Sequence, residues 1–207
     1  MDEALRVTAL RQTSPGRITV ELSDGSQIKS TLNVVTDLRL FPGKALDEES
    51  LRAIRSASAL VRIRSRALDL LSRRPMSRKE LYDKLVQKGE DEQAAAASVQ
   101  WLAENRLLND EEYAASVARH YAAKGYGAGR VRAELSRRGL PRELWDEALA
   151  QMPAGDEKLV KYIASHLSDP GDRDQVRKVS AALFRRGYSW DEIRGALRQY
   201  EVEAEEE

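Results

Sequence analysis

Residues 124–140 read KGYGAGRVRAELSRRGL, and the second half of this stretch has the pattern of a short amphipathic helix. Val131 and Leu135 are four residues apart and therefore share one face of that helix. Gly139 can adopt the left-handed conformation that ends a helix, and Leu140 can then fold back over the last turn. The stretch predicts a helix with an apolar face, a defined end and a basic flank.

Two weaker copies of this helix occur, one upstream and one downstream. In each copy two apolar residues four apart are followed four residues later by glycine, and the three sets are Leu81, Leu85, Gly89; Val131, Leu135, Gly139; and Val179, Leu183, Gly187. The first apolar residues stand at positions 81, 131 and 179, so the periods are 50 and 48 residues. A predicted helix precedes and follows each copy, which makes the unit three helices. Tandem units of this size stack on their neighbours, so we expect an elongated array.

The only β-like part of the sequence lies before residue 36. The apolar residues that alternate with polar ones there are Ile18, Val20, Leu22, Ile28, Leu32 and Val34. Asp24 and Gly25 supply a turn between two strands, and residues 5–10 can form a third strand. A sheet this small is marginal alone and should pack against a helix. Asp47 is a candidate N-cap, and helical spacing continues from there to Arg74, which predicts one long helix.

The predicted fold is mainly α, with three tandem three-helix repeats and a small N-terminal β element. The expected parts are a β element at 1–45, the long helix and first repeat at 46–106, the second repeat at 107–153, the third repeat at 154–200 and a solvated, frayed acidic tail at 201–207. The tryptophans fall in, or at the start of, the third helix of a repeat, where we expect core residues: Trp101, Trp145 and Trp190.

Charged residues make up 33% of the chain, against roughly 25% in an average globular protein, which suits helices with many exposed faces. The chain has no cysteine, so disulfide bonds and thiolate chemistry are excluded, and this fits a reducing compartment. No apolar run approaches the ~20 residues of a membrane span, and the N-terminus lacks the pattern of an export signal. We therefore expect a cytoplasmic protein without a membrane partner.

The formal net charge of zero conceals a segregation of charge along the sequence. Residues 62–89 contain nine Lys or Arg against three Asp or Glu, and residues 119–142 contain seven against one. Segregation on this scale predicts a basic surface that meets a polyanion or an acidic protein. For any single cluster, a solvated charged helix face remains the alternative.

Catalytic chemistry has little support in the sequence. The two histidines, His120 and His166, form no His and Cys metal cluster and no evident Ser-His-Asp arrangement. The glycines of residues 125–129 suggest a phosphate loop, but no strand precedes them and no Gly-Lys-Ser/Thr follows. Their simpler role is a flexible bend, with amide groups near a helix start that can bind an anion. We expect no enzyme activity, no metal and no cofactor.

Basic residues around the central helix are the candidate binding residues. Lys124, Arg130 and Arg132 lie at or before the helix start, where the helix dipole makes positive charge unfavourable. Basic residues in a last turn are instead favoured by ~0.3–1 kcal/mol and need no partner to explain them. Tyr126 can stack on a base or pack on a partner. With the repeat equivalents added, the predicted set for contacts with a protein or DNA partner is Lys124, Tyr126, Arg130, Arg132, Arg137, Lys178 and Arg185.

The stretch from Lys124 to Gly139 resembles the signature of the bacterial RecX regulatory proteins. The resemblance extends through Leu107–Tyr113 and the Ser77–Gly89 helix, and it covers roughly residues 60–200. The family commonly has Pro or another residue where this chain has Ala128-Gly129, and the extra glycine can loosen the helix start. The N-terminal β-like stretch is similar to an extension found in only some members. RecX proteins consist of tandem three-helix repeats, which agrees with the periodicity above.

The resemblance implies a non-enzymatic regulator of the RecA recombinase. RecX proteins bind RecA, notably its filament on single-stranded DNA, and inhibit strand exchange and ATP hydrolysis by the filament. They thereby moderate recombination and the SOS response. For this chain the resemblance implies RecA as partner, and we expect a monomer that binds single- or double-stranded DNA alone only weakly. Two alternatives stay open: a stand-alone nucleic-acid-binding module that uses residues 129–138, and a helical scaffold whose charges serve solubility.

Overall fold

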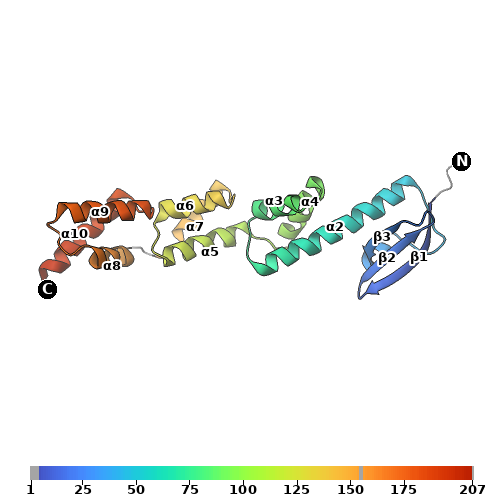
Figure 1. The fold of residues 1–207 in the computed structure, drawn as a ribbon, viewed down its shortest axis with the longest axis horizontal. Helices are drawn as coiled ribbons and strands as arrows, with labels where there is room; N and C mark the ends of the chain where they lie inside the picture. The colour runs from blue at the N-terminus through green and yellow to red at the C-terminus, as the bar shows by residue number, and fades with distance from the viewer. Residues whose placement is uncertain (1–4, 154–155, 207) are drawn as a thin grey trace. The chain divides into compact units, whose positions relative to one another are not determined.

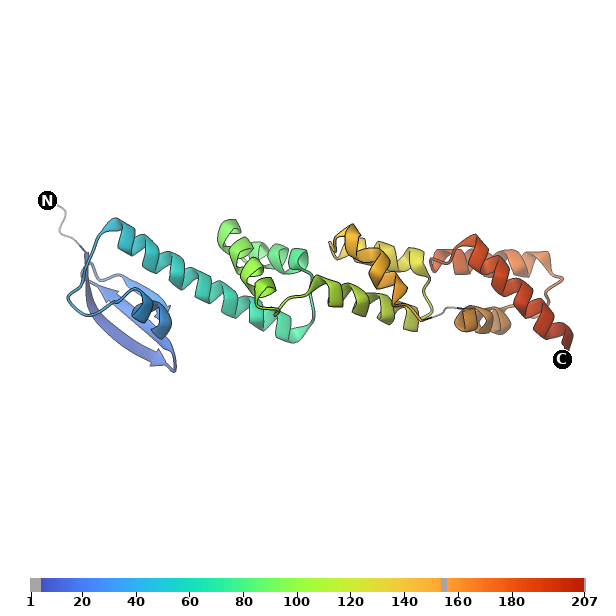
Figure 2. The same ribbon diagram turned by 180° about the vertical axis from the view of Figure 1, so that it is seen from behind.

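The computed structural model describes residues 5–153 and 156–206 (Figure 1, Figure 2). The chain divides into two compact units. The first unit comprises Met1–Pro75 and Leu81–Leu107, and the second comprises Met76–Glu80 and Leu108–Glu207. Helix α3, Arg78–Gln87, therefore contributes its first residues to the second unit and its remainder to the first.

An antiparallel sheet with the strand order β3-β2-β1-β4 opens the first unit. Its first three strands were predicted from the sequence. The strands are β1, Leu5–Ser14; β2, Arg17–Leu22; β3, Gln27–Thr31; and β4, Ala45–Leu46. The two-residue β4, which no alternation signals, pairs with the start of β1. Both views show the sheet beside the first half of α2, Glu48–Arg73, where the Ser58 hydroxyl donates to the Ser30 hydroxyl at 2.9 Å (Figure 1, Figure 2). The sheet thus packs against a helix, as its small size requires.

The prediction that Leu32 and Val34 continue a strand is wrong. They lie in a short helix, α1, which spans Leu32–Asp37. Val34 and Val35 are both buried, and neighbouring residues of a strand would point to opposite faces. One helical turn can bury both against the sheet, while Leu32 stays 53% exposed. Alternation of three apolar residues did not distinguish these two arrangements.

Helix α2 runs unbroken to Arg73, as predicted, and its second half joins α3 and α4 (Glu92–Glu104) in the first repeat. Its start is capped by the Asp47 carboxylate, which accepts a backbone hydrogen bond of 2.7 Å. Arg62 and Arg66, one turn apart, both pair with Glu90, whose side chain is only 1% exposed. These two ion pairs hold the loop after α3 against α2.

The second unit contains the second and third repeats. Its helices are α5, Asp110–Ala123; α6, Ala128–Arg137; the 3-10 helix Arg142–Leu144; α7, Trp145–Ala150; α8, Asp156–His166; α9, Arg173–Arg185; and α10, Trp190–Glu206. Each repeat has its own apolar core, built around Val131 and Leu135 in the second repeat and around Val179 and Leu183 in the third. Because α10 continues to Glu206, the expected tail at 201–207 begins within a helix and extends beyond the described residues.

The predicted helix ends are confirmed in all three repeats. Gly89, Gly139 and Gly187 have positive φ angles of 82°, 65° and 91°. After each glycine, the next backbone N–H donates to the carbonyl five residues before it, as in Leu140 to Leu135 at 3.1 Å. This is the Schellman arrangement, in which a left-handed residue lets the chain satisfy the last free carbonyls of a helix. The three-helix periodicity in the sequence is therefore a periodicity of structure.

Candidate functional site

The glycine-rich loop before α6 meets the end of α9. The Gly127 N–H donates to the Arg186 carbonyl at 3.0 Å, and the Gly129 N–H donates to the Gly187 carbonyl at 2.9 Å. Both ribbon views show the start of α6 next to the end of α9 (Figure 1, Figure 2). We call this contact the α9–α6 joint. These two amides are bonded to carbonyls, so the bend is a joint between repeats and they are not free to bind an anion.

The close approach explains why glycine stands at these positions. A Cβ atom at Gly127 would lie 2.5 Å from the Gly187 carbonyl oxygen, and one at Gly129 would lie 3.0 Å from the same atom. Neither position has a positive φ angle, so the requirement comes from space between the two backbones. The helix end at α9 carries negative partial charge and the helix start at α6 carries positive partial charge, so the joint is also electrostatically favourable.

A second joint of the same kind lies fifty residues earlier, at Ser77, the repeat equivalent of Gly127. The Ser77 hydroxyl donates to the Arg138 carbonyl at the end of α6 and accepts from the Glu80 N–H at 3.0 Å. The Glu80 carboxylate accepts from the Ser77 N–H at 3.1 Å, which completes a capping box. Asp110, at the start of α5, accepts from the Arg78 N–H at 2.9 Å. The start of α3 therefore meets the end of α6 here, as the start of α6 meets the end of α9 in the α9–α6 joint.

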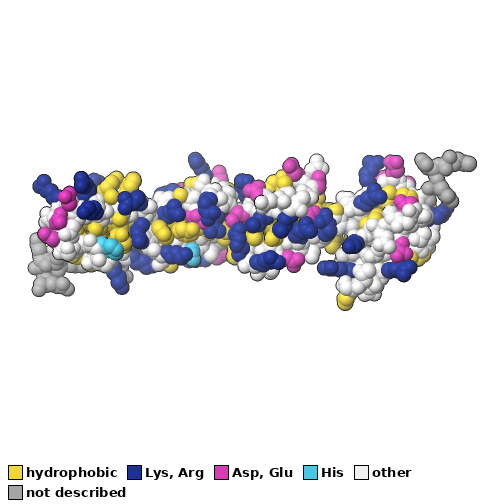
Figure 3. All heavy atoms as spheres, viewed as in Figure 1, with side chains coloured by type: hydrophobic (Ala, Val, Ile, Leu, Met, Phe, Trp, Pro, Cys, Tyr) yellow, Lys and Arg dark blue, Asp and Glu magenta, His cyan; other side chains and the backbone are white. Residues whose placement is uncertain are grey.

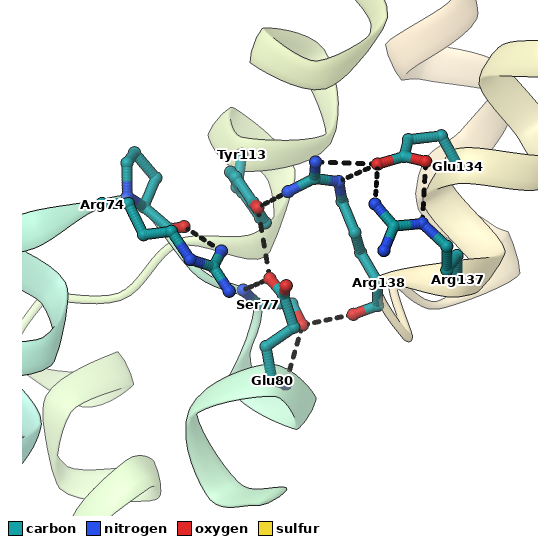
Figure 4. Close-up of polar contacts among 8 residues, drawn as sticks. Arg74, Ser77, Glu80, Tyr113, Glu134, Arg137 and Arg138 are labelled. Atoms are coloured by element: carbon teal, nitrogen blue, oxygen red, sulfur yellow. Dashed lines mark hydrogen bonds and ion pairs between the residues drawn. The ribbon is translucent and has the colours of Figure 1, made fainter. Parts of the chain in front are cut away.

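A chain of polar side chains surrounds this second joint (Figure 4). The Tyr113 hydroxyl donates to Glu80 at 3.1 Å, and Arg138 contacts both the Tyr113 hydroxyl and the carboxylate of Glu134. Glu134 is only 4% exposed and also accepts from Arg137 Nε at 2.9 Å. The hydrogen bond from Arg137, followed by that from Arg138, lowers the pKa of Glu134 to about 2 despite its burial. Arg137, a predicted contact residue, thus has a buried carboxylate partner within its own helix.

Three of the other predicted contact residues come together at the α9–α6 joint. Arg130 and Arg132 of α6 and Arg185 of α9 line one hollow of about 460 Å³, and all three side chains are exposed. Within the described part of the chain, none of the three forms an ion pair. We call Arg130, Arg132 and Arg185 the arginine cluster. The joint assembles it from residues more than fifty positions apart in the sequence.

Lys124 lies in a different hollow. That hollow, of about 260 Å³, is also lined by Lys158, Lys161 and Arg186. Lys158 donates to the carbonyls that end α5, with a bond of 3.0 Å to Ala123. Lys124 is therefore part of a second basic surface that the sequence did not indicate.

Tyr126 and Lys178 line neither of these two hollows. Tyr126 is partly buried, its ring lies 5.6 Å from that of Tyr121, and Arg130 and Arg186 each lie 5.9 Å from its ring centre. Its ring thus already contacts aromatic and cationic side chains of the protein itself. Lys178 is exposed on α9, two turns before the arginine cluster, and does not line either hollow.

The prediction that Trp190 lies in the core is wrong. Trp190 is 49% exposed, and its ring stacks on that of Phe184, which is 51% exposed, at 5.1 Å between ring centres. Trp190 begins α10, and the buried residues of that helix follow it, starting at Ile193. Phe184 lines the same hollow as the arginine cluster. The exposure of Phe184 could have been inferred from its position in the sequence. It directly follows Leu183, which belongs to the apolar face of the predicted helix, and it precedes Arg185.

The two histidines lie at the surface of their helices. His120 and His166 are both exposed, and the His166 ring stacks on Tyr162 at 4.1 Å. Among the residues that the structure describes, no group of three His, Cys, Asp or Glu side chains is placed to hold a metal ion. In the same part of the chain, every helix is too short or too polar to cross a membrane.

The fold and the arginine cluster define a class of protein built of three-helix repeats, with a basic surface assembled where repeats meet. Family descriptions match the same units: "RecX, first three-helix domain" covers residues 64–102, and "RecX, second three-helix domain" covers residues 109–149. The regulatory protein RecX of Xanthomonas axonopodis pv. citri (strain 306) is 41% identical over 137 residues, which are 64% of this chain and 84% of that protein. The chain belongs to the RecX family.

Other relatives and solved structures agree with this assignment. The regulatory protein RecX of Stenotrophomonas maltophilia (strain R551-3) is 39% identical over 137 residues, 64% of this chain and 83% of that protein. A crystal structure of regulatory protein RecX matches with a TM-score of 0.77 and 26% identity, covering 91% of this chain and 96% of that one. RecX from Lactobacillus salivarius matches with a TM-score of 0.65 and 25% identity, covering 70% and 99% respectively.

Replacement of Gly127 by alanine tests the α9–α6 joint. We expect Gly127→Ala to lower the free energy of unfolding by about 1–3 kcal/mol, because the added Cβ meets the Gly187 carbonyl. Gly195→Ala in α10 is the matched control, since its Cβ would meet nothing within 4 Å and alanine is favoured in a helix by about 1 kcal/mol. Urea denaturation of both variants measures the difference. Equal stability of Gly127→Ala and the native protein would refute the close contact.

A second prediction concerns Glu134 and pH. Its folded pKa of about 2 lies below the usual value of 4.5, so ionised Glu134 stabilises the fold above pH 4.5 and this contribution is lost as the pH falls towards 2. Glu134→Gln should therefore lower the urea midpoint at pH 7, by an amount that shrinks below pH 4.5. Glu147→Gln, on the exposed side of α7, is the control and should change little at either pH. A Glu134→Gln deficit of the same size at pH 7 and pH 3 would contradict the assignment.

Proposed function

We propose that this protein binds the RecA recombinase, above all its filament on single-stranded DNA, and inhibits its recombinase and ATPase activities. In this way it moderates recombination and the SOS response in the cytoplasm, without catalysis of its own. Family membership and the name "regulatory protein" of its relatives support a regulatory role. The observation that carries the proposal on this chain is the arginine cluster, which has no anionic partner in the described residues.

The position of Arg130 and Arg132 supports an external partner. Arg130 lies in the first turn of α6, where the helix dipole disfavours positive charge by about 0.3–1 kcal/mol, and Arg132 follows two residues later. Arg137, at the other end of the same helix, is stabilised both by the dipole and by Glu134. An external anion would offset the unfavourable charge at the helix start. A recombinase filament offers DNA phosphates and acidic protein side chains as such anions.

A stand-alone nucleic-acid-binding module is the second candidate. The exposed aromatic pair beside the arginine cluster favours it, because aromatic rings and arginines together suit DNA binding. Salt dependence separates the two candidates. For a pure phosphate binder, log affinity falls with log salt by about 0.7–0.9 for every phosphate neutralised, whereas a protein–protein contact is less sensitive.

The test is the ATPase activity of RecA filaments on single-stranded DNA, titrated with this protein and its variants. We expect the native protein to inhibit, and Arg130→Ala/Arg132→Ala to need about tenfold more protein for half inhibition, which corresponds to about 1.4 kcal/mol. The double variant should not unfold at a lower temperature, because both side chains are exposed and positive charge is unfavourable at a helix start. Arg52→Ala/Arg55→Ala removes the same charge from exposed positions on α2 and should inhibit as the native protein does. Equal inhibition by both double variants would exclude the arginine cluster as the contact.

A further inference from the structure

The Phe184–Trp190 pair is an exposed aromatic surface next to the arginine cluster, which forms no ion pair within the described residues. The two rings are nearly parallel, with an angle of 18° between their planes, and each is about half exposed. The apolar residues beside them along the chain are buried: Leu183 is 1% exposed and Ile193 is 0% exposed. The third repeat therefore has a complete core without these rings, and burial of apolar surface does not explain them.

The rings are also not used by the protein's own cations. Arginines lie over other aromatic rings in the described residues, as Arg138 does over Tyr113 and Arg186 over Tyr162. In that same part of the chain, no arginine or lysine lies over Phe184 or Trp190. About half of each ring is exposed, so the stacked pair presents aromatic surface to a ligand.

The surroundings of the pair are basic. Phe184 lines the hollow of about 460 Å³ together with the arginine cluster. One carboxylate, that of Glu192, also lines this hollow, and it accepts a hydrogen bond of 2.6 Å from the Ser189 N–H at the start of α10. On the face shown in Figure 3, Lys and Arg side chains lie next to hydrophobic side chains over α9. The surface thus combines exposed aromatic rings with cations that can reach an anion beside them.

We propose that this surface binds unpaired nucleotides, with a base stacked on the Phe184–Trp190 pair and phosphates held by the arginine cluster. An acidic peptide would satisfy the arginines but leave the flat ring faces unused. A duplex offers phosphates, but its bases are stacked on one another and turned away from a protein surface. Only a single strand supplies free base faces and phosphates side by side. This deepens the proposed function, since it assigns this surface to the strand on which the RecA filament forms.

The experiment measures binding of a fluorescein-labelled oligo(dT) by anisotropy, with no recombinase present. We expect the single strand to bind at least about tenfold more tightly than a duplex of equal length. Trp190→Ala and Phe184→Ala should each weaken binding of the single strand by about 5- to 100-fold, the range for loss of one stacked base. Trp190→Phe keeps an aromatic ring and should retain most of the affinity. Phe41→Ala, which removes a 57% exposed ring of the first unit, should bind as the native protein does.

Three results would overturn the inference. The first is equal affinity for duplex and single strand. The second is a Trp190→Phe variant that binds as weakly as Trp190→Ala, and the third is a Trp190→Ala variant that binds as tightly as the native protein. Each of these results leaves the proposed function standing, because RecA inhibition is measured separately. Conversely, a protein that prefers single strands but leaves the RecA ATPase unchanged would support the inference and refute the proposed function.

Discussion

Two backbone hydrogen bonds, from the N–H groups of Gly127 and Gly129 to the last carbonyls of α9, are the contact on which the candidate site depends. They place the start of α6 against the end of α9 with no side chain between them. Arg130 and Arg132 then lie beside Arg185, although these residues belong to different repeats. The glycines that look like a ligand-binding loop in the sequence serve instead to bring two backbones together.

The same arrangement recurs at Ser77, with different chemistry. At this joint the hydroxyl of Ser77, and not a backbone amide, donates to the carbonyl of Arg138. The buried carboxylate of Glu134 pairs with the side chain of Arg138. A hydroxyl leaves room for side chains at the joint, whereas direct amide contact does not. This difference explains why the Ser77 joint is surrounded by a polar network and the Gly127 joint by glycines.

The repeats were predictable because they rest on local spacing. Leu135 and Gly139 define a helix face and a helix end within a few residues, and the same spacing recurs in the other copies. The change from strand to helix at Val34 was not predictable, because it depends on how Val34 and Val35 pack against the sheet. The site was predictable only in part. Arg130 was identifiable from its unfavourable place at a helix start. Its proximity to Arg185 was not, because it depends on a contact across repeats. The exposure of Trp190 was not predictable either, because it depends on how α10 packs.

Family membership and the arginine cluster together lead to one central claim, that this protein acts by binding a RecA filament. The most direct measurement is co-sedimentation of the protein with preformed RecA filaments on single-stranded DNA, compared with the same DNA alone, at rising salt. The account predicts that the protein pellets with filaments at salt concentrations where it no longer pellets with DNA. If the amount that pellets with filaments never exceeds the amount that pellets with DNA alone, the protein does not bind the recombinase and the claim fails.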